Sequence, residues 1–238
     1  RAPGPRDIAA IRNFNGARFL DHSDDLYLEN VHIEGGITGA LHCDAAADRN
    51  VVGVSCSFRY SSPSNTASPL DAVRIRRTNG LIAFFDCDAS CGAKDGWSFH
   101  QDDAIAMQVV LSNCTSFENG AFSATSCNAV TAHDSVIAAI VGGRFGYSRN
   151  GAEVHVVQNA RMWVIGAHVT ARDPDGSCVT FKSSNETNLW LEQTRADAAG
   201  GAIENLDIEA NGGSVFVRGH IAEAGVNAIY GGGSISAF

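Results

Sequence analysis

The sequence lacks the features that mark helical bundles, membrane proteins and nucleic-acid binders. It has only 5 Pro in 238 residues, and no apolar run reaches the roughly 18 residues that a membrane helix needs. Hydrophobic residues make up 45% and charged residues 18%, which indicates a globular chain. The formal net charge of −9 argues against binding to nucleic acid through phosphate contacts. We therefore expect neither a membrane segment nor a nucleic-acid partner.

The seven cysteines form no CxxC pair, and no Cys/His spacing matches a zinc site. We expect most of them to be buried thiols. One segment, Asp86 to Ser90, resembles the start of a calcium loop. Its glycine comes late, at Gly92, and Trp97 stands where such a loop needs a glutamate. We therefore expect no cofactor, with calcium as a minor alternative.

A short pattern recurs along the whole chain: an apolar strand, a turn rich in Gly, Asn or Asp, and a second alternating strand. Equivalent positions in the first strand lie 24 to 31 residues apart, at Val31, Cys56, Cys87, Cys114, Gly143, Ala167, Thr194 and Gly219. A nearly constant period of this length is typical of one coil per repeat. The sequence thus predicts a single all-β domain over residues 1–238, a single-stranded right-handed parallel β-helix (solenoid) of about eight coils.

Period-two alternation predicts which side chains face the interior. Cys56, Cys87 and Cys114 should stack inside as a ladder. The large apolar residues of the first strands should stack beside them, namely Ile33, Phe58, Phe145, Val169 and Ile221. Residues 6–12 look helical, and we expect them to cap the end of the stack.

The second strand of each coil carries the chemistry. We align it on one inward apolar position, occupied by Leu41, Val73, Phe99, Val130, Val154, Val179, Ile203 and Ile229. The next residue then points outward, which gives His42, Arg74, His100 and His155. Two residues further on come Asp44, Arg76, Asp102, His133 and Lys182, while Glu153 precedes its anchor. Because adjacent coils lie about 4.8 Å apart, these side chains should share one elongated, locally basic face. The first strands project a second basic set, His32, Arg144, His168, Arg195 and His220.

The repeat resembles the pectin-lyase-like β-helix superfamily of polysaccharide lyases, epimerases, polygalacturonases and phage tailspikes. Lys94-Asp95-Gly96-Trp97-Ser98-Phe99 is similar to a strand opening of polygalacturonases, with Asp95 at the position of the acid. Thr180-Phe181-Lys182 is similar to their Arg-Ile-Lys element, and Gly96 to His100 resembles a run of alginate epimerases. The resemblance implies a carbohydrate-active protein located outside the cell, in the periplasm or on a virion.

Three functions fit this pattern. The first is a lyase or C5-epimerase acting on an acidic, uronate-containing polysaccharide. Arg74, Arg76 and Lys182 would neutralise the sugar carboxylate, and His100, His133 or His155 would serve as base and acid. Asp102 would orient His100, and His42, Asp44 and Asp95 would help to bind substrate.

The second function is an inverting glycoside hydrolase, which needs two carboxyl groups roughly 6.5–9.5 Å apart. Asp102 and Glu153 are the candidate pair, and Asp95 is a third candidate. The third function is a tailspike or adhesin that binds glycan without cleaving it. A homo-oligomer is compatible with all three.

Overall fold

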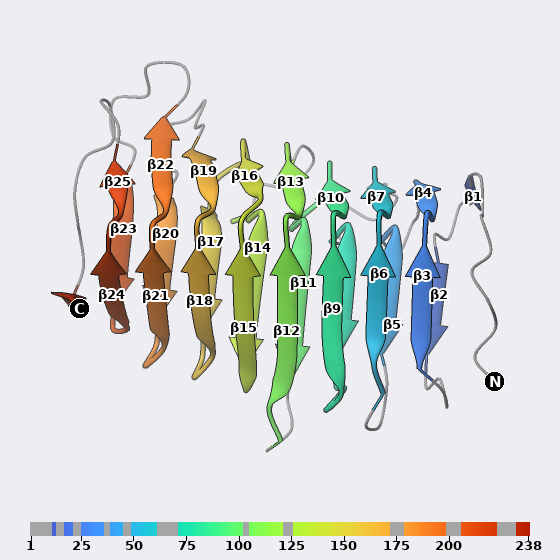
Figure 1. Ribbon diagram of the computed structural model, residues 1–238, viewed down its shortest axis with the longest axis horizontal. Coiled ribbons are helices and arrows are strands. Elements are labelled where there is room, and N and C mark those ends of the chain that lie inside the picture. The colour runs from blue at the N-terminus through green and yellow to red at the C-terminus, as the bar shows by residue number, and fades with distance from the viewer. Residues whose placement is uncertain are drawn as a thin grey trace.

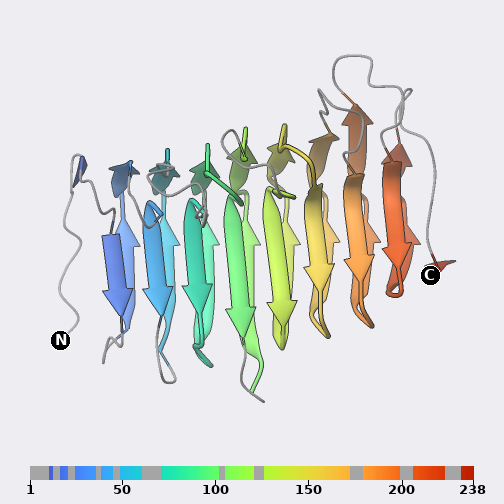
Figure 2. The same cartoon turned by 180° about the vertical axis from the view of Figure 1, so that it is seen from behind.

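The chain folds into a stack of flat coils, each built from short strands. The structure is a computed structural model that describes residues 11–12, 17–20, 25–35, 39–44, 49–60, 71–101, 105–120, 126–171, 179–198, 206–222 and 232–238. In these ranges all regular secondary structure is β-strand, and successive strands pass in turn through three parallel sheets (Figures 1 and 2). This arrangement confirms the predicted right-handed parallel β-helix. None of the described residues forms a helix that could span a membrane.

Each sheet runs the length of the stack. Sheet A consists of β1 (Ile11–Arg12), β4 (His32–Glu34), β7 (Ser57–Arg59), β10 (Asp88–Ser90), β13 (Thr115–Phe117), β16 (Arg144–Gly146), β19 (His168–Ala171), β22 (Arg195–Ala198) and β25 (Ile221–Ala222). Sheet B consists of β2 (Ala17–Leu20), β5 (Leu41–Asp44), β8 (Val73–Arg76), β11 (Trp97–Gln101), β14 (Val130–Asp134), β17 (Ala152–Val157), β20 (Val179–Ser184) and β23 (Leu206–Asn211). Sheet C consists of β3 (Leu26–Glu29), β6 (Val51–Val54), β9 (Leu81–Phe85), β12 (Met107–Ser112), β15 (Val136–Val141), β18 (Arg161–Ile165), β21 (Asn188–Glu192), β24 (Ser214–Arg218) and β26 (Ser234–Ala237).

The corner from sheet C to sheet A explains the Gly, Asn and Asp of the sequence repeat. One residue at each corner has a left-handed backbone with φ between 51° and 65°: Asn30, Ser55, Asp86, Asn113, Gly142, Gly166, Gln193 and Gly219. Gly adopts this conformation freely, and Asn and Asp tolerate it better than other residues. The same turn in every coil keeps the coils in register.

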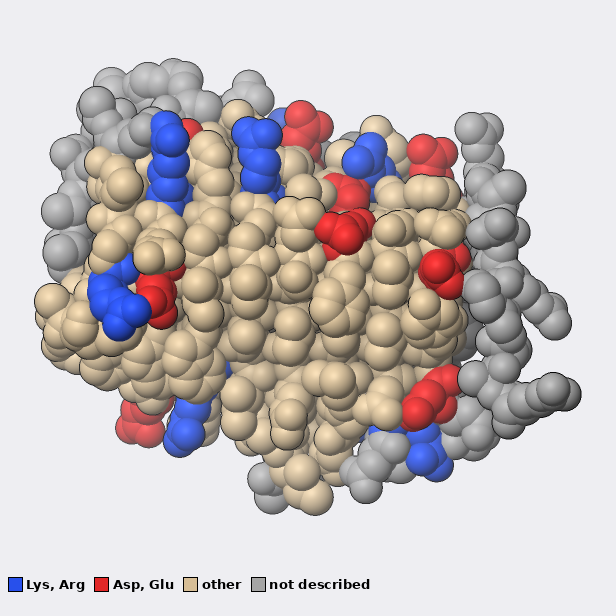
Figure 3. All heavy atoms as spheres, in the orientation of Figure 1, with Lys and Arg blue, Asp and Glu red and all other residues tan. Residues whose placement is uncertain are grey.

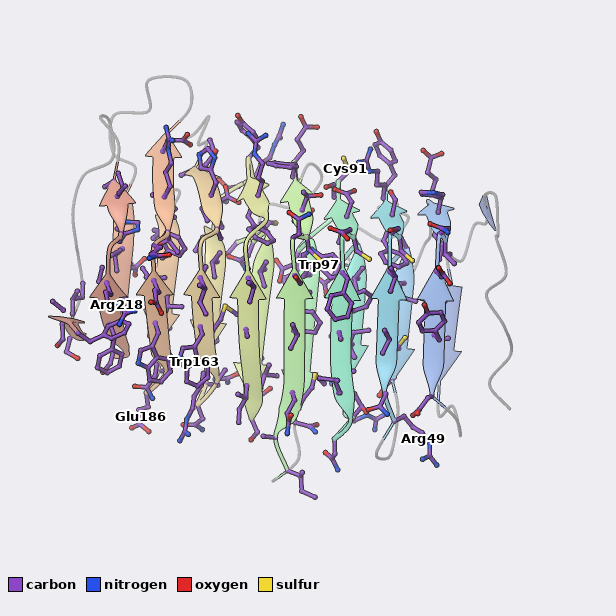
Figure 4. The ribbon with its side chains drawn as sticks, in the orientation of Figure 1. Arg49, Cys91, Trp97, Trp163, Glu186 and Arg218 are labelled. Atoms are coloured by element: carbon purple, nitrogen blue, oxygen red, sulfur yellow. The ribbon has the colours of Figure 1, made fainter. Side chains whose placement is uncertain are left out.

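The interior follows the predicted inward pattern. Cys56, Cys87 and Cys114 are at most 2% exposed, and the Cys56 amide donates to the Cys87 sulfur at 3.3 Å. This confirms the cysteine ladder. Next to it Trp97, labelled in Figure 4, packs against Phe84 with ring centroids 4.8 Å apart. Burial without competing polar groups is what stabilises such a core.

Two predictions about the ends of the stack are wrong. Ile221 is 60% exposed, because it pairs with the outward Arg195 in the last strand of sheet A. Ile33, Phe58, Phe145 and Val169 are buried as expected. In the proposed helical cap, Ile11–Arg12 instead forms strand β1, which pairs with β4. Residues 6–10 lie outside the described part of the chain.

Candidate functional site

The outer face of sheet B carries two rows of polar side chains. Strand pairing aligns one row, the Arg74 row, as His42, Arg74, Ser98, Thr131, His155, Lys182 and Glu209. It aligns the other, the Arg76 row, as Asp44, Arg76, His100, His133, Val157 and Ser184. Sheet B lies on the side of the stack opposite sheet C (Figure 2). The predicted His42, Arg74, Arg76, His100, His133, His155 and Lys182 therefore share one face, as expected.

The order within the rows differs from the prediction at two strands. Trp97, not Phe99, pairs with Val73, and Phe181, not Val179, pairs with Val154. Each difference is two residues, so every side chain keeps its inward or outward direction. The consequence is that His100 lies between Arg76 and His133, and Lys182 lies beside His155. The anchors Ile203 and Ile229 fall outside the described residues.

His100 occupies the centre of the Arg76 row. Its Nε2 lies 2.9 Å from the Ser98 hydroxyl oxygen on the same strand, and its ring stacks on that of His133 with centroids 4.3 Å apart and planes 9° apart. Burial first, then the nearby His133 and Arg74, lower the pKa of His100 to about 2. The imidazole is therefore neutral at physiological pH.

His133 is the second imidazole of this row. Its Nδ1 lies 3.5 Å from Gln158 Oε1, and burial lowers its pKa. Asp134 follows at the end of β14 with φ 63°, and the ligand atoms of His100, His133 and Asp134 lie within 4.8 Å of one another. An imidazole binds a metal along a lone pair in its ring plane. Two stacked, nearly parallel rings do not direct these lone pairs to one point, so the rings would have to rotate to share a cation.

Arg74 belongs to a buried ionic group at the edge of sheet B. Its Nε lies 3.8 Å from Asp71 Oδ2, and Asp71 Oδ1 accepts the Asp95 amide at 3.2 Å. Asp95 in turn accepts the Asn128 amide and the Thr131 hydroxyl, both at 2.9 Å. Burial and the neighbouring Asp71 raise the pKa of Asp95 to about 7.

Asp95 was expected to contact substrate, and the structure does not support this. The residue is 1% exposed, and its two carboxylate oxygens accept hydrogen bonds from Asn128, just before β14, and from Thr131 within β14. Glu153 is likewise fully buried, and its Oε1 accepts the Ser148 amide at 2.9 Å. Both carboxylates thus satisfy backbone donors, which is the usual role of buried acidic groups.

At the other end of the Arg74 row the cation Lys182 lies beside the imidazole of His155 on the neighbouring strand. Lys182 Nζ lies 2.9 Å from Glu209 Oε2, and His155 Nε2 lies 3.1 Å from the Ser184 hydroxyl oxygen. Burial, followed by Lys182, lowers the pKa of His155 to about 3. Asp44 lies in the Arg76 row but forms its ion pair with Arg77 at 2.6 Å. His42 is half-buried in the Arg74 row, and Asp102 lies outside the described residues.

Several members of the site were missed from the sequence. Asp71 and Glu209 supply the carboxylates beside Arg74 and Lys182, and Ser98 holds the His100 ring. The i, i+3 spacing of Asp71 and Arg74 was the one signal available for the first pair. In the segment Asp86 to Ser90, which resembles the start of a calcium loop, the Asp88 carboxylate is bound by Arg59 at 2.6 Å and by the Thr115 hydroxyl at 2.6 Å.

Comparisons of this chain with protein-family models, with curated proteins and with solved structures find no match. The function must therefore be inferred from the geometry and chemistry of the face itself.

Proposed function

We propose that the outer face of sheet B binds an acidic, uronate-containing polysaccharide and removes the proton beside the sugar carboxylate, as a lyase or a C5-epimerase does. One observation carries this proposal: Arg76, His100 and His133 occupy the same position on three consecutive strands. Adjacent strands are about 4.8 Å apart. A fixed cation thus lies one coil from the neutral His100 and two coils from the neutral His133, with Arg74 in the next row.

The proposed chemistry needs two groups with different tasks. Arg74 and Arg76 would bind the carboxylate and stabilise the negative charge that develops when C5 loses its proton. The neutral His100 would accept that proton. In a lyase the C5–H electron pair forms a C4–C5 double bond, the C4–O bond breaks, and the leaving oxygen takes a proton from an imidazolium. In an epimerase a proton returns to C5 from water on the opposite side of the sugar, and His100 releases its proton to solvent.

Substrate binding would also strengthen the base. Burial is the main cause of the low pKa of His100, and His133, Arg74, Lys94 and Arg76 add to it. A bound carboxylate would offset the charge of both guanidinium groups and thereby raise the pKa of His100 in part.

Two of the three carboxylates predicted for hydrolysis are too deeply buried for that reaction, and the third, Asp102, lies outside the described residues. An inverting hydrolase needs two carboxyl groups that flank the scissile bond. Asp95 and Glu153 are 1% and 0% exposed, and their hydrogen bonds hold loops. A glycan-binding protein without catalysis remains the competing function, and the test below separates it.

The test is incubation with a panel of neutral and uronate-containing polysaccharides. We expect an unsaturated uronate absorbing in the ultraviolet, or a changed C5 configuration detected by NMR. His100→Gln should lower the rate by roughly 10²–10⁴-fold, whereas His32→Gln, on the exposed face of sheet A, should not. New reducing ends without either product would support hydrolysis, and retention of unchanged glycan would support the binder.

A further inference from the structure

The outer face of sheet C is broad, apolar and free of charge at its centre. On strands β6, β9, β12 and β15 every outward residue is uncharged, and Leu81, Phe85, Ile137 and Val141 are 37–42% exposed. Figure 3 shows this face, with charged atoms mainly toward its borders. None of the described segments covers this face.

The size of the face matches a protein interface. Eight strands spaced about 4.8 Å apart and three outward rows of side chains cover roughly 35 Å by 20 Å, or about 700 Å². A stable complex buries about 800 Å² on each partner.

The middle row of this face changes character halfway along the stack. In the first half its members are Tyr27, Val52, Ala83 and Val110, and in the second half Ala139, Trp163, Trp190 and Phe216. The aromatic rings of the second half stack on one another. Trp163 and Trp190 have centroids 4.3 Å apart with planes 4° apart, and Trp190 and Phe216 are 5.2 Å apart. Trp163 lies on the outer side of its strand in Figure 4.

This order is self-complementary under one symmetry operation. A two-fold axis parallel to the strands, between β12 and β15, reverses the order of coils and keeps each row opposite itself. Ala83 of one copy then faces Trp163 of the other, and Val52 faces Trp190. At these two strand pairs a smaller side chain meets a tryptophan across the interface, as close packing favours.

The charges at the two ends of the face agree with the same operation. Glu29 stands at the β3 end, next to Tyr27. Arg218 stands at the β24 end, where its side chain is 58% exposed although it binds Glu192. Reversal of the coil order brings Glu29 of one copy opposite Arg218 of the other. With the coils parallel, the β3 ends of both copies would meet each other, and Glu29 would lie far from Arg218 of the other copy.

We infer that two copies of this chain associate through the outer faces of sheet C, with their coils in antiparallel order. The contact leaves sheet B of both copies exposed, so this inference is independent of the proposed function.

Sedimentation equilibrium tests the association. The wild-type protein should be a dimer. Val110→Glu and Ala139→Glu, which place two like charges near the axis, should each weaken association at least tenfold while circular dichroism stays unchanged. Arg144→Glu, an exposed change on sheet A, should leave it unchanged. A monomeric wild type, or a dimer indifferent to both glutamates, would overturn the inference.

Cross-linking tests the orientation. Tyr27 and Phe216 lie about 34 Å apart in one chain, seven strand spacings. In the antiparallel dimer each faces the other across the interface. Oxidation of the double variant Tyr27→Cys, Phe216→Cys should therefore give a covalent dimer, and Tyr27→Cys alone should give no more than the wild type. Cross-linking of the single variant to itself would show parallel coils and overturn the proposed axis.

Discussion

At the scale of single residues, His155 should make the fold sensitive to acid. Its pKa is lowered to about 3 by burial and by Lys182, with Glu153 on the same strand and Ser184 as its hydrogen-bond partner. In the unfolded chain the imidazole takes up a proton near pH 6.5. Between these values the unfolded state binds more protons, so the free energy of unfolding falls as pH falls from about 7 toward 3.

The prediction is that His155→Gln flattens this dependence. Urea unfolding at pH 7, 5.5 and 4 should show a smaller loss of stability for the variant than for the wild type. His32→Gln, at an exposed position of sheet A, provides the matched control and should keep the wild-type slope. Equal slopes for all three proteins would show that His155 is as accessible to protons in the fold as in the unfolded chain.

Two neighbouring glycines allow two effects on stability to be measured separately: the cost of a left-handed backbone and the cost of a steric clash at Cβ. Gly142 and Gly143 both have a positive φ, of 65° and 88°. A Cβ on Gly142 would meet nothing within 4 Å, whereas on Gly143 it would lie 2.2 Å from the Cys114 carbonyl oxygen. Gly142→Ala should therefore cost about 1 kcal/mol, and Gly143→Ala more than about 3 kcal/mol. Chemical denaturation measures both, and equal losses would contradict the close contact.

At the scale of elements, the left-handed corner between sheets C and A sets the turn of every coil. Gln193 adopts φ 51° there, at the position that Gly166 occupies one coil earlier with φ 64°. Gln193→Gly should relieve strain and stabilise the fold by about 0.5–1 kcal/mol. The reverse change, Gly166→Gln, should destabilise it by a similar amount, although a Cβ there meets nothing within 4 Å. Destabilisation by both changes would mean that side-chain contacts, not φ, decide this corner.

The strand rows also show how far sequence can place a site in a solenoid. Alternation identified the outward side chains because their direction depends only on odd or even position. It could not distinguish Trp97 from Phe99 as the partner of Val73, since Trp-Ser-Phe-His-Gln alternates equally well in both registers. Because the loops between coils differ in length, counting residues from one coil to the next cannot decide between these two registers. The contact between His100 and His133 therefore emerges only from the structure.

The burial of the acidic side chains was the other property that the alternation of the sequence could not predict. Asp95 precedes a strand whose sequence resembles a strand opening of known enzymes. Its carboxylate nevertheless accepts hydrogen bonds from Asn128 and Thr131 of the next coil. The loop before β14 provides one donor and β14 itself the other, and the path of that loop is not encoded in period-two alternation. The same holds for Glu153 and the Ser148 amide.

At the scale of the whole molecule, a chain of net charge −9 is proposed to bind an anionic polymer. Arg74, Arg76 and Lys182 place three cations on one face, although Asp71 and Glu209 pair with two of them. These cations would attract the polymer despite the overall repulsion. Exposed charges are screened over about 8 Å at physiological ionic strength. Affinity for a polyuronate, measured by calorimetry, should therefore fall as salt is raised. Binding that is indifferent to salt, or stronger for neutral glycans, would point to another ligand class.

Proton abstraction at C5 is the central chemical step, and one measurement tests it for lyase and epimerase together. The protein is incubated with a uronate polymer in D₂O, and NMR follows both unsaturated product and deuterium at C5. We predict one of these signals with the wild type and with His32→Gln, and its loss by roughly 10²–10⁴-fold with His100→Gln. Glycan that is bound or hydrolysed with C5–H intact, or a folded His100→Gln with the wild-type rate, would contradict the account.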